Sequence, residues 1–144
     1  VQSSLAQAPL RSPTVFNFYH SDYVLPGPLA AAGLVVPEFE ITDDNYAINV
    51  PNFLRTYVNA TVPTTPPGPY TITLKTTAEQ ALLPTPAALL DHLSLVLTAN
   101  TLPANIRDRI IRALEALPAS TSTFDRTNTA ILLVLTSPAS AVQK

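Results

Sequence analysis

The chain contains no cysteine, methionine or tryptophan, and only three of its 144 residues are glycine. Without cysteine there is no disulfide, no cysteine-bound zinc and no thiol nucleophile. The three glycines, Gly27, Gly33 and Gly68, are too far apart to form the glycine-rich loop that cradles phosphate groups. The composition therefore excludes thiol chemistry and the common phosphate-binding loops.

Charge is also scarce. Charged residues make up 12% of the chain and hydrophobic residues 47%, whereas about a quarter of a typical soluble domain is charged. Two interpretations are open: a soluble domain with a surface rich in Thr, Ser, Asn and Ala, or a piece whose apolar faces are covered by the rest of a larger protein or by partners. The net charge is −2 and there are only two lysines, so the basic footprint of a nucleic-acid-binding protein is missing.

Long hydrophobic runs are absent too. The longest, Ala130–Leu135, has six residues, whereas a membrane-spanning helix needs about 20, so we expect no transmembrane segment. The length corresponds to about one domain. The chain begins at Val1 without a charged and then apolar leader, and we expect it to be a processed product or a fragment.

One stretch, Ser12–Glu40, differs from the rest, and we call it the aromatic segment. It places five aromatic residues among four prolines: Phe16, Phe18, Tyr19, Tyr23 and Phe39 among Pro13, Pro26, Pro28 and Pro37. The prolines interrupt regular structure, yet the stretch is too apolar for a solvated loop. We therefore expect it to lie against this chain's own core or against another surface, and its five aromatic residues are candidate interaction residues.

A proline-rich break over residues 60–69, ATVPTTPPGP, divides the chain. Four prolines and a glycine in ten residues favour extended, polyproline-like backbone. We predict an aromatic-rich part over residues 1–59, a Pro/Thr linker over residues 60–69 and an aliphatic helical core over residues 70–144, together one structural unit of a larger domain. Eight of the ten aromatic residues lie before the break.

Structural signals before the break are short. Gln2–Gln7 is compatible with the end of a helix. Pro28–Ala32 predicts one helical turn that Gly33 stops, a common role for glycine after a helix. Leu34–Ile41 is expected to be extended at most.

A longer helix is predicted over about residues 42–59. The string TDDN places Thr42 or Asp43 at its cap and acidic residues in its first turn. Apolar residues then recur at helical spacing up to Tyr57. Pro51 lies inside this pattern and either kinks the helix or divides it in two.

Three helices are predicted after the break: Pro86 to about Thr98, Pro103 to before Pro118, and Ser122 or Thr123 to Thr136. The apolar faces expected on the first two are Leu89, Leu90, Leu93, Val96 and Leu97, and Ile106, Ile110, Leu114 and Leu117. The second helix is expected to turn Arg107, Asp108, Arg109, Arg112 and Glu115 to solvent, with anion binding as a less favoured role. The third is apolar nearly all round and should be central.

The remaining signals after the break are minor. Tyr70–Lys75 alternates like a short strand but has no clear partner, and a short tail follows Pro138. The fold class is therefore mainly α: a small helical bundle with long proline-rich irregular segments and at most one short strand or hairpin.

Two histidines are candidates for chemistry. His20 is followed by Asp22 within the aromatic segment, so it is a candidate general base or metal ligand; the simpler interpretation is a polar side chain bonded to local backbone. His92 lies among leucines, where a lone histidine is most often a core or boundary residue. We expect no self-contained catalytic site.

One acidic cluster, Glu38, Glu40, Asp43 and Asp44, is a candidate site for a hard cation, because such ions take several oxygen ligands. No EF-hand spacing is present. The simpler interpretation is that Asp43 and Asp44 cap a helix and that the glutamates point outward around Phe39. We expect no cofactor.

The aromatic segment contains a pattern made of Pro13, Val15, Phe16, Asn17, Phe18, Tyr23, Pro26, Gly27, Gly33, Leu34, Val35, Pro37, Glu38 and Phe39. In this pattern it resembles part of a large bacterial family known as domain-of-unknown-function family 1800. The strings LLDHLSLVLTANTLPANIRDRIIRAL and AILLVLTSPASAVQK are similar to the closing helices of that family. The Pro/Thr linker looks like a variable insertion.

The resemblance implies that this chain is the C-terminal part of a longer, mostly helical domain. It also implies a periplasmic or secreted location, because members are often exported. No activity or catalytic residue is established for the family, so none is carried over, and the family's own His- and Trp-containing motif lies upstream of the matching region.

Three functional hypotheses follow. The leading one is a structural or interaction module that docks, through apolar and aromatic contacts, on the remainder of its parent protein or on another subunit. The second is a non-autonomous part of an exported hydrolase, to which His20, Asp22 and the nearby acids contribute and whose main catalytic residues lie upstream. The third is an accessory subunit of an envelope complex.

Overall fold

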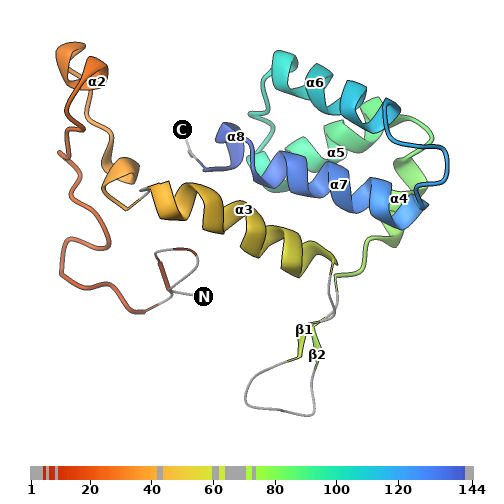
Figure 1. The fold of residues 1–144 in the computed structure, drawn as a ribbon, viewed down its shortest axis with the longest axis horizontal. Helices are drawn as coiled ribbons and strands as arrows, with labels where there is room; N and C mark the ends of the chain where they lie inside the picture. The colour runs from red at the N-terminus through yellow and green to blue at the C-terminus, as the bar shows by residue number, and fades with distance from the viewer. Residues whose placement is uncertain are drawn as a thin grey trace. The chain divides into compact units, whose positions relative to one another are not determined.

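The computed structural model describes residues 5, 7–8, 10–41, 44–59, 62–63, 71–72 and 74–141 (Figure 1). The chain forms two compact units, an N-terminal unit, Val1–Phe53, and a C-terminal unit, Leu54–Lys144. The division lies inside helix α3, whereas the sequence placed the end of its first part at residue 59, where that helix ends. The predicted helix end at Gln2–Gln7 lies almost wholly outside the described residues.

Before α3, the described residues of the N-terminal unit include two short helices. The turn predicted at Pro28–Ala32 is confirmed as α2 (Pro28–Ala31), followed by Gly33 with a φ of 69°. The prediction that Leu34–Ile41 is at most extended is wrong, because Pro37–Glu40 forms the 3₁₀ helix η1. Pro37 stands at its first position, where a fixed φ suits a helix start and no backbone donor is needed.

Helix α3 (Asp44–Asn59) continues through Pro51 without dividing. Proline removes one intrahelical hydrogen bond, and here the helix tolerates that loss. The predicted caps, Thr42 and Asp43, lie outside the described residues. The helix contributes its first part to the N-terminal unit and its last residues to the C-terminal unit.

The strand expected after the break has a partner inside the Pro/Thr linker. β1 (Val62–Pro63) pairs antiparallel with β2 (Thr71–Ile72), and Val62 stands opposite Ile72. The rest of the linker lies outside the described residues. This minimal ladder leaves the fold mainly helical, as the sequence predicts.

The C-terminal unit is a helical bundle built from α4 (Thr77–Leu82), α5 (Pro86–Thr98), α6 (Ala104–Glu115), α7 (Thr123–Leu135) and α8 (Pro138–Ala141). Helix α7 contacts all four of the others, and α5 packs on α4, α6 and α8 (Figure 1). The prediction of a central α7 is therefore confirmed, whereas α4 was not predicted. No described helix combines the length and the apolarity needed to cross a bilayer.

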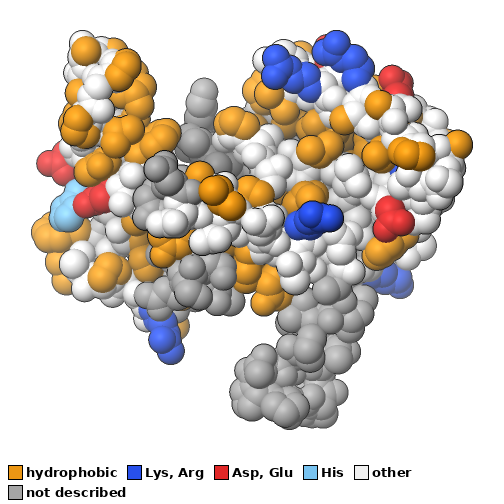
Figure 2. All heavy atoms as spheres, in the orientation of Figure 1, with side chains coloured by type: hydrophobic (Ala, Val, Ile, Leu, Met, Phe, Trp, Pro, Cys, Tyr) orange, Lys and Arg blue, Asp and Glu red, His pale blue; other side chains and the backbone are white. Residues whose placement is uncertain are grey.

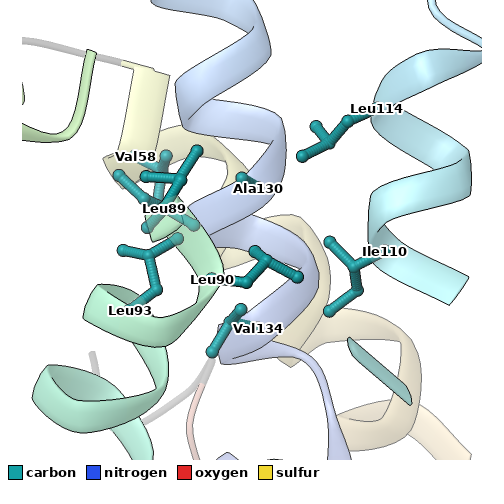
Figure 3. Packing of buried hydrophobic residues seen from close by; sticks show 9 residues of the cluster. Val58, Leu89, Leu90, Leu93, Ile110, Leu114, Ala130 and Val134 are labelled. Carbon is teal, nitrogen blue, oxygen red and sulfur yellow. The ribbon is translucent and has the colours of Figure 1, made fainter. Parts of the chain in front are cut away.

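The core of this unit is aliphatic (Figure 3). Its buried members are Val58, Leu89, Leu90, Leu93, Ile110, Leu114, Ala130, Ile131 and Val134. Burying one Leu, Ile or Val side chain contributes about 1.5–3 kcal/mol, so these side chains provide the main stabilisation. The prediction that the helices from Pro86 to Thr136 form the core is confirmed, with Val58 added from α3.

Two side chains differ from their predicted faces. Val96 was placed on the buried face of α5 but is exposed, while Ser94 and Thr98 are buried in the same helix. These polar residues are tolerated there because the Thr98 hydroxyl donates to the Ser94 carbonyl at 2.8 Å. Arg107 is not on the solvent face of α6: it is half-buried and donates to Asp91 on α5 at 2.7 Å.

Side-chain hydrogen bonds stabilise the turn between α6 and α7. The Ser122 hydroxyl accepts a hydrogen bond from the Asp125 backbone N–H at 3.0 Å, as predicted for a helix start. Arg126 donates to carbonyls at the end of α6 and in the turn, those of Leu114, Leu117, Pro118 and Thr121.

Thr85, the cap predicted for α5, stands at the cap position but makes no such side-chain bond.

Helix α5 ends in a strained conformation. Ala99 has a φ of 48° and the following Asn100 one of 65°, a region in which the Cβ of an L-residue costs about 1–2 kcal/mol. Replacing Ala99 with glycine is therefore expected to raise the free energy of unfolding by about 0.5–1 kcal/mol, after the entropic cost of glycine is subtracted. Urea denaturation followed by circular dichroism measures this.

The matched control is Ala113→Gly, at an exposed position inside α6. Glycine relieves no strain at this position, and we expect the free energy of unfolding to fall by about 1 kcal/mol. Equal losses from the two substitutions would contradict the assignment of strain to Ala99.

Candidate functional site

The aromatic segment presents apolar side chains to solvent. No described residue before Val58 is buried. The large hydrophobic side chains exposed within the segment are Val15, Phe16, Val24, Leu34, Val35 and Phe39. Figure 2 shows hydrophobic side chains covering the region of α2 on the face in view. An exposed apolar surface of this kind is typical of an interaction site.

A short turn displays two of these side chains. The Asn17 N–H donates to the Thr14 carbonyl at 3.2 Å, and the Phe16 N–H donates to the Thr14 hydroxyl at 3.1 Å. Asn17 has a φ of 74°, which asparagine tolerates better than most residues. Val15 and Phe16 therefore lie at the tip of a hydrogen-bonded turn, where they are 95% and 66% exposed.

The five predicted interaction residues are not alike. Phe16 and Phe39 are exposed, whereas Phe18, Tyr19 and Tyr23 are half-buried. The ring of Phe16 lies against the ring of His20, with 5.9 Å between the two centroids. The sequence prediction named only aromatic residues. It left out the exposed aliphatic side chains of the same segment, chiefly Val15, Leu34 and Val35.

The partner of His20 is Glu40. The His20 backbone N–H donates to Glu40 Oε2 at 2.6 Å, and His20 Nδ1 lies 2.9 Å from Glu40 Oε1. Asp22, the expected partner, acts on His20 only through its charge. The structure thus brings together one residue of the predicted catalytic pair and one of the predicted acidic cluster.

The electrostatics of the His20–Glu40 pair are mutual. The side-chain hydrogen bond and the charge of Glu40 raise the pKa of His20 above its ordinary value of 6.5, and the charge of Asp22 adds to this. The hydrogen bonds from the backbone N–H and ring of His20 lower the pKa of Glu40 below 4.5. Both shifts favour the charged forms.

The setting of the pair is open to water. The His20 side chain is 58% exposed and that of Glu40 28% exposed. A histidine held by a carboxylate has the composition of a general base, but electrostatic catalysis gains most where water is excluded. The geometry therefore favours a role in local structure over one in catalysis.

The predicted cation site receives no further ligands among the described residues. Within them, His, Asp and Glu side chains form no group of three or more that could hold a metal ion. Glu40 is engaged by His20. Asp43 and the side chain of Asp44 lie outside what the structure describes.

His92 lies at the boundary of the C-terminal bundle. Its Nε2 is 3.1 Å from Glu79 Oε1, so it links α5 to α4. Both side chains are partly buried, in agreement with the interpretation of His92 as a boundary residue. The pair joins two helices that are adjacent in the chain.

A pocket of about 320 Å³ in the C-terminal unit is lined by residues of α4, α5, α6 and α7. Leu83, Pro84, Pro86 and Leu114 provide apolar walls, and Arg126 also lines the pocket. That guanidinium already donates to four carbonyls. The guanidinium of Arg126 therefore stabilises the turn between α6 and α7.

Comparisons with models of protein families, with curated proteins and with solved structures find no match to this chain. The resemblance to family 1800 therefore stays a prediction, as do the exported location and the C-terminal position that it implies.

Proposed function

We propose that this protein is an interaction module in which the aromatic segment binds an apolar surface of a protein partner. The partner is the remainder of a larger parent protein or another subunit. One observation carries the proposal: Val15 and Phe16 project into solvent from the tip of a hydrogen-bonded turn. By the family resemblance, the proposal extends to a periplasmic or secreted setting.

The energetics support binding through these side chains. Burying an exposed Val or Phe contributes about 1.5–3 kcal/mol, and Phe39, Leu34 and Val35 add further apolar surface. In the N-terminal unit none of the described residues is buried, so the unit has no core of its own among them to stabilise it. A partner surface would supply that missing burial.

The prolines reduce the entropic cost of binding. Pro13, Pro26, Pro28 and Pro37 restrict the backbone of the segment. A restricted segment loses less conformational freedom when it binds than a flexible one does. The prolines that restrict the segment therefore favour docking.

Charge indicates the character of the partner. The aromatic segment contains no Lys or Arg, and its acidic residues are Asp22, Glu38 and Glu40. Two surfaces that bind each other favour complementary charges, so an acidic surface favours a partner whose rim is basic or neutral. We therefore expect a partner surface with an apolar centre and a neutral or basic rim.

The test removes two exposed rings together, Phe16→Ser with Phe39→Ser. We expect lower fluorescence of the neutral dye Nile red bound to the full chain, and less self-association in size-exclusion chromatography with light scattering. The circular-dichroism signal at 222 nm should stay unchanged, because neither ring belongs to the helical core. Each removal should weaken partner binding about tenfold or more, since 1.4 kcal/mol corresponds to a factor of ten.

Phe124→Ser is the matched control, because Phe124 is an exposed phenylalanine in α7, outside the aromatic segment. It should leave dye binding and association nearly as in the unmodified chain. The proposal fails if the unmodified chain is monomeric and binds no dye, or if the control lowers the signal as much as the double variant.

A further inference from the structure

The carboxylate of Glu40 closes a long loop. It accepts the backbone N–H of His20 and lies within 2.9 Å and 3.2 Å of His20 Nδ1 through its two oxygens. The two residues are 20 positions apart in the chain. One side chain thus fixes both the backbone and the ring of the residue at the far end of the loop.

A second contact closes the same loop without any titratable group. The Val36 N–H donates to the Tyr23 carbonyl at 2.9 Å. The chain between these two residues carries α2, flanked by Gly27 and Gly33 with positive φ values of 125° and 69°. The base of the loop therefore has one contact between backbone groups and one contact, through Glu40, that includes a titratable pair.

The His20–Glu40 pair also joins the two exposed rings of the aromatic segment. The ring of Phe16 lies 5.9 Å from that of His20, centroid to centroid, and Phe39 directly precedes Glu40. When the pair is formed, the turn that carries Val15 and Phe16 is connected to η1, which carries Phe39. The pair thus lies between the two short elements that carry the exposed rings.

The charges acting on the pair set the pH range in which His20 and Glu40 are both charged. Because the pKa of His20 is raised in the folded protein, its charge contribution is fully present below 6.5 and is lost as pH rises through the raised value. Because the pKa of Glu40 is lowered, its contribution is present above 4.5 and is lost as pH falls through the lowered value. Asp22 favours the protonated form of His20 as well.

Solvent exposure limits the strength of the pair, because salt screens exposed charges. Above the raised pKa of His20, the backbone hydrogen bond to Glu40 remains while the attraction between opposite charges disappears. The expected effect of alkaline pH is therefore a looser loop rather than an unfolded one.

We propose that the His20–Glu40 pair is a pH-sensitive switch that holds the exposed rings of the aromatic segment in their binding arrangement under mildly acidic conditions and loosens that arrangement under alkaline ones. This inference rests on the proposed function, since it concerns the regulation of the same surface. The switch needs no ligand and no second protein.

The experiment follows the His20 ring by NMR from pH 5 to pH 9 in the full chain, with the His92 signals assigned from a His92→Gln variant. We expect Glu40→Gln to lower the pKa of His20 from its raised value toward the ordinary one. Glu38→Gln is the matched control on the same short helix and should leave the titration unchanged. Nile red fluorescence is recorded over the same pH range.

In the unmodified chain and in Glu38→Gln, dye fluorescence should change with the titration of His20, and in Glu40→Gln this pH dependence should be lost. If the pKa of His20 is unchanged in Glu40→Gln, the switch is wrong. It is also wrong if the dye fluorescence of the unmodified chain does not change over the pH range in which His20 titrates. Failure of the interaction module itself would look different, with no dye binding at any pH while the effect of Glu40→Gln on the His20 titration persists.

Discussion

Replacing Leu90 with alanine is expected to lower the free energy of unfolding by about 3–4 kcal/mol. Leu90 is fully buried, at 0% exposure, within the aliphatic core (Figure 3). The substitution removes the apolar transfer energy of the side chain and leaves a cavity that the packed helices fill only in part, and such changes cost about 2–5 kcal/mol. Since a domain is stable by only about 5–15 kcal/mol, the effect is a large fraction of the total.

The measurement is urea denaturation of the full chain followed at 222 nm, with the slope of the transition checked for two-state behaviour. Leu95→Ala is the matched control, because Leu95 lies on the same helix but is 64% exposed. It should cost no more than about 0.5 kcal/mol. Similar losses from the two leucines would show that the core is not where the structure places it.

Replacing Asn128 with aspartate is the second change with a large expected effect, about 3–5 kcal/mol at neutral pH. Asn128 is 1% exposed, and its Nδ2 donates to the Val58 carbonyl and to Asn59 Oδ1, each at 3.2 Å. A carboxylate of the same shape would lose both donations and set a buried charge against two oxygens. An uncompensated buried charge costs about this much.

The loss should shrink as pH falls. Burial without a positive partner raises the pKa of the introduced carboxyl in the folded state above its unfolded value, about 3.9. The destabilisation is therefore complete above the raised folded value and declines as the pH falls from there toward the unfolded value, because the protonated carboxyl is neutral and can donate again. Denaturation at pH 7 and at pH 4.5 measures this difference.

The matched control is Asn105→Asp, which makes the same chemical change at an exposed position in the first turn of α6. A negative charge near a helix N-terminus is neutral or slightly favourable, so we expect a change within about 0.5 kcal/mol. If Asn128→Asp cost as little at neutral pH, the bond that joins α7 to the end of α3 would have no role in stability.

Local chemistry explains which helices the sequence revealed. The apolar period of α5, α6 and α7, together with Pro86 and the capping Ser122, acts within a few residues of itself and is readable without a fold. Helix α4 was missed because its six residues are too few to establish a period. Val96 was misplaced because a broad apolar face does not reveal which of its edges meets a neighbour.

The candidate site divides in the same way. The apolar character of the aromatic segment follows from its composition, and its five aromatic residues were predicted as interaction residues. That Phe16 and Phe39 are the exposed ones among them is visible only in the structure. Their exposure is now observed; their binding is still a proposal. The partner of His20 was not predictable, because Asp22 is near in sequence whereas Glu40 reaches His20 only when the loop closes.

By itself, the sequence determined the mainly helical class, the bounds of the three long aliphatic helices and the unusual apolar character of Ser12–Glu40. These depend on periodicity, caps and composition, which act over short stretches of chain. Only the tertiary structure decided that Asn128 bonds to the end of α3 some 70 residues away, that Val62 pairs with Ile72, and that Glu40 holds His20. Such contacts depend on how the chain returns to itself, and in this chain nothing in the local pattern specifies those returns.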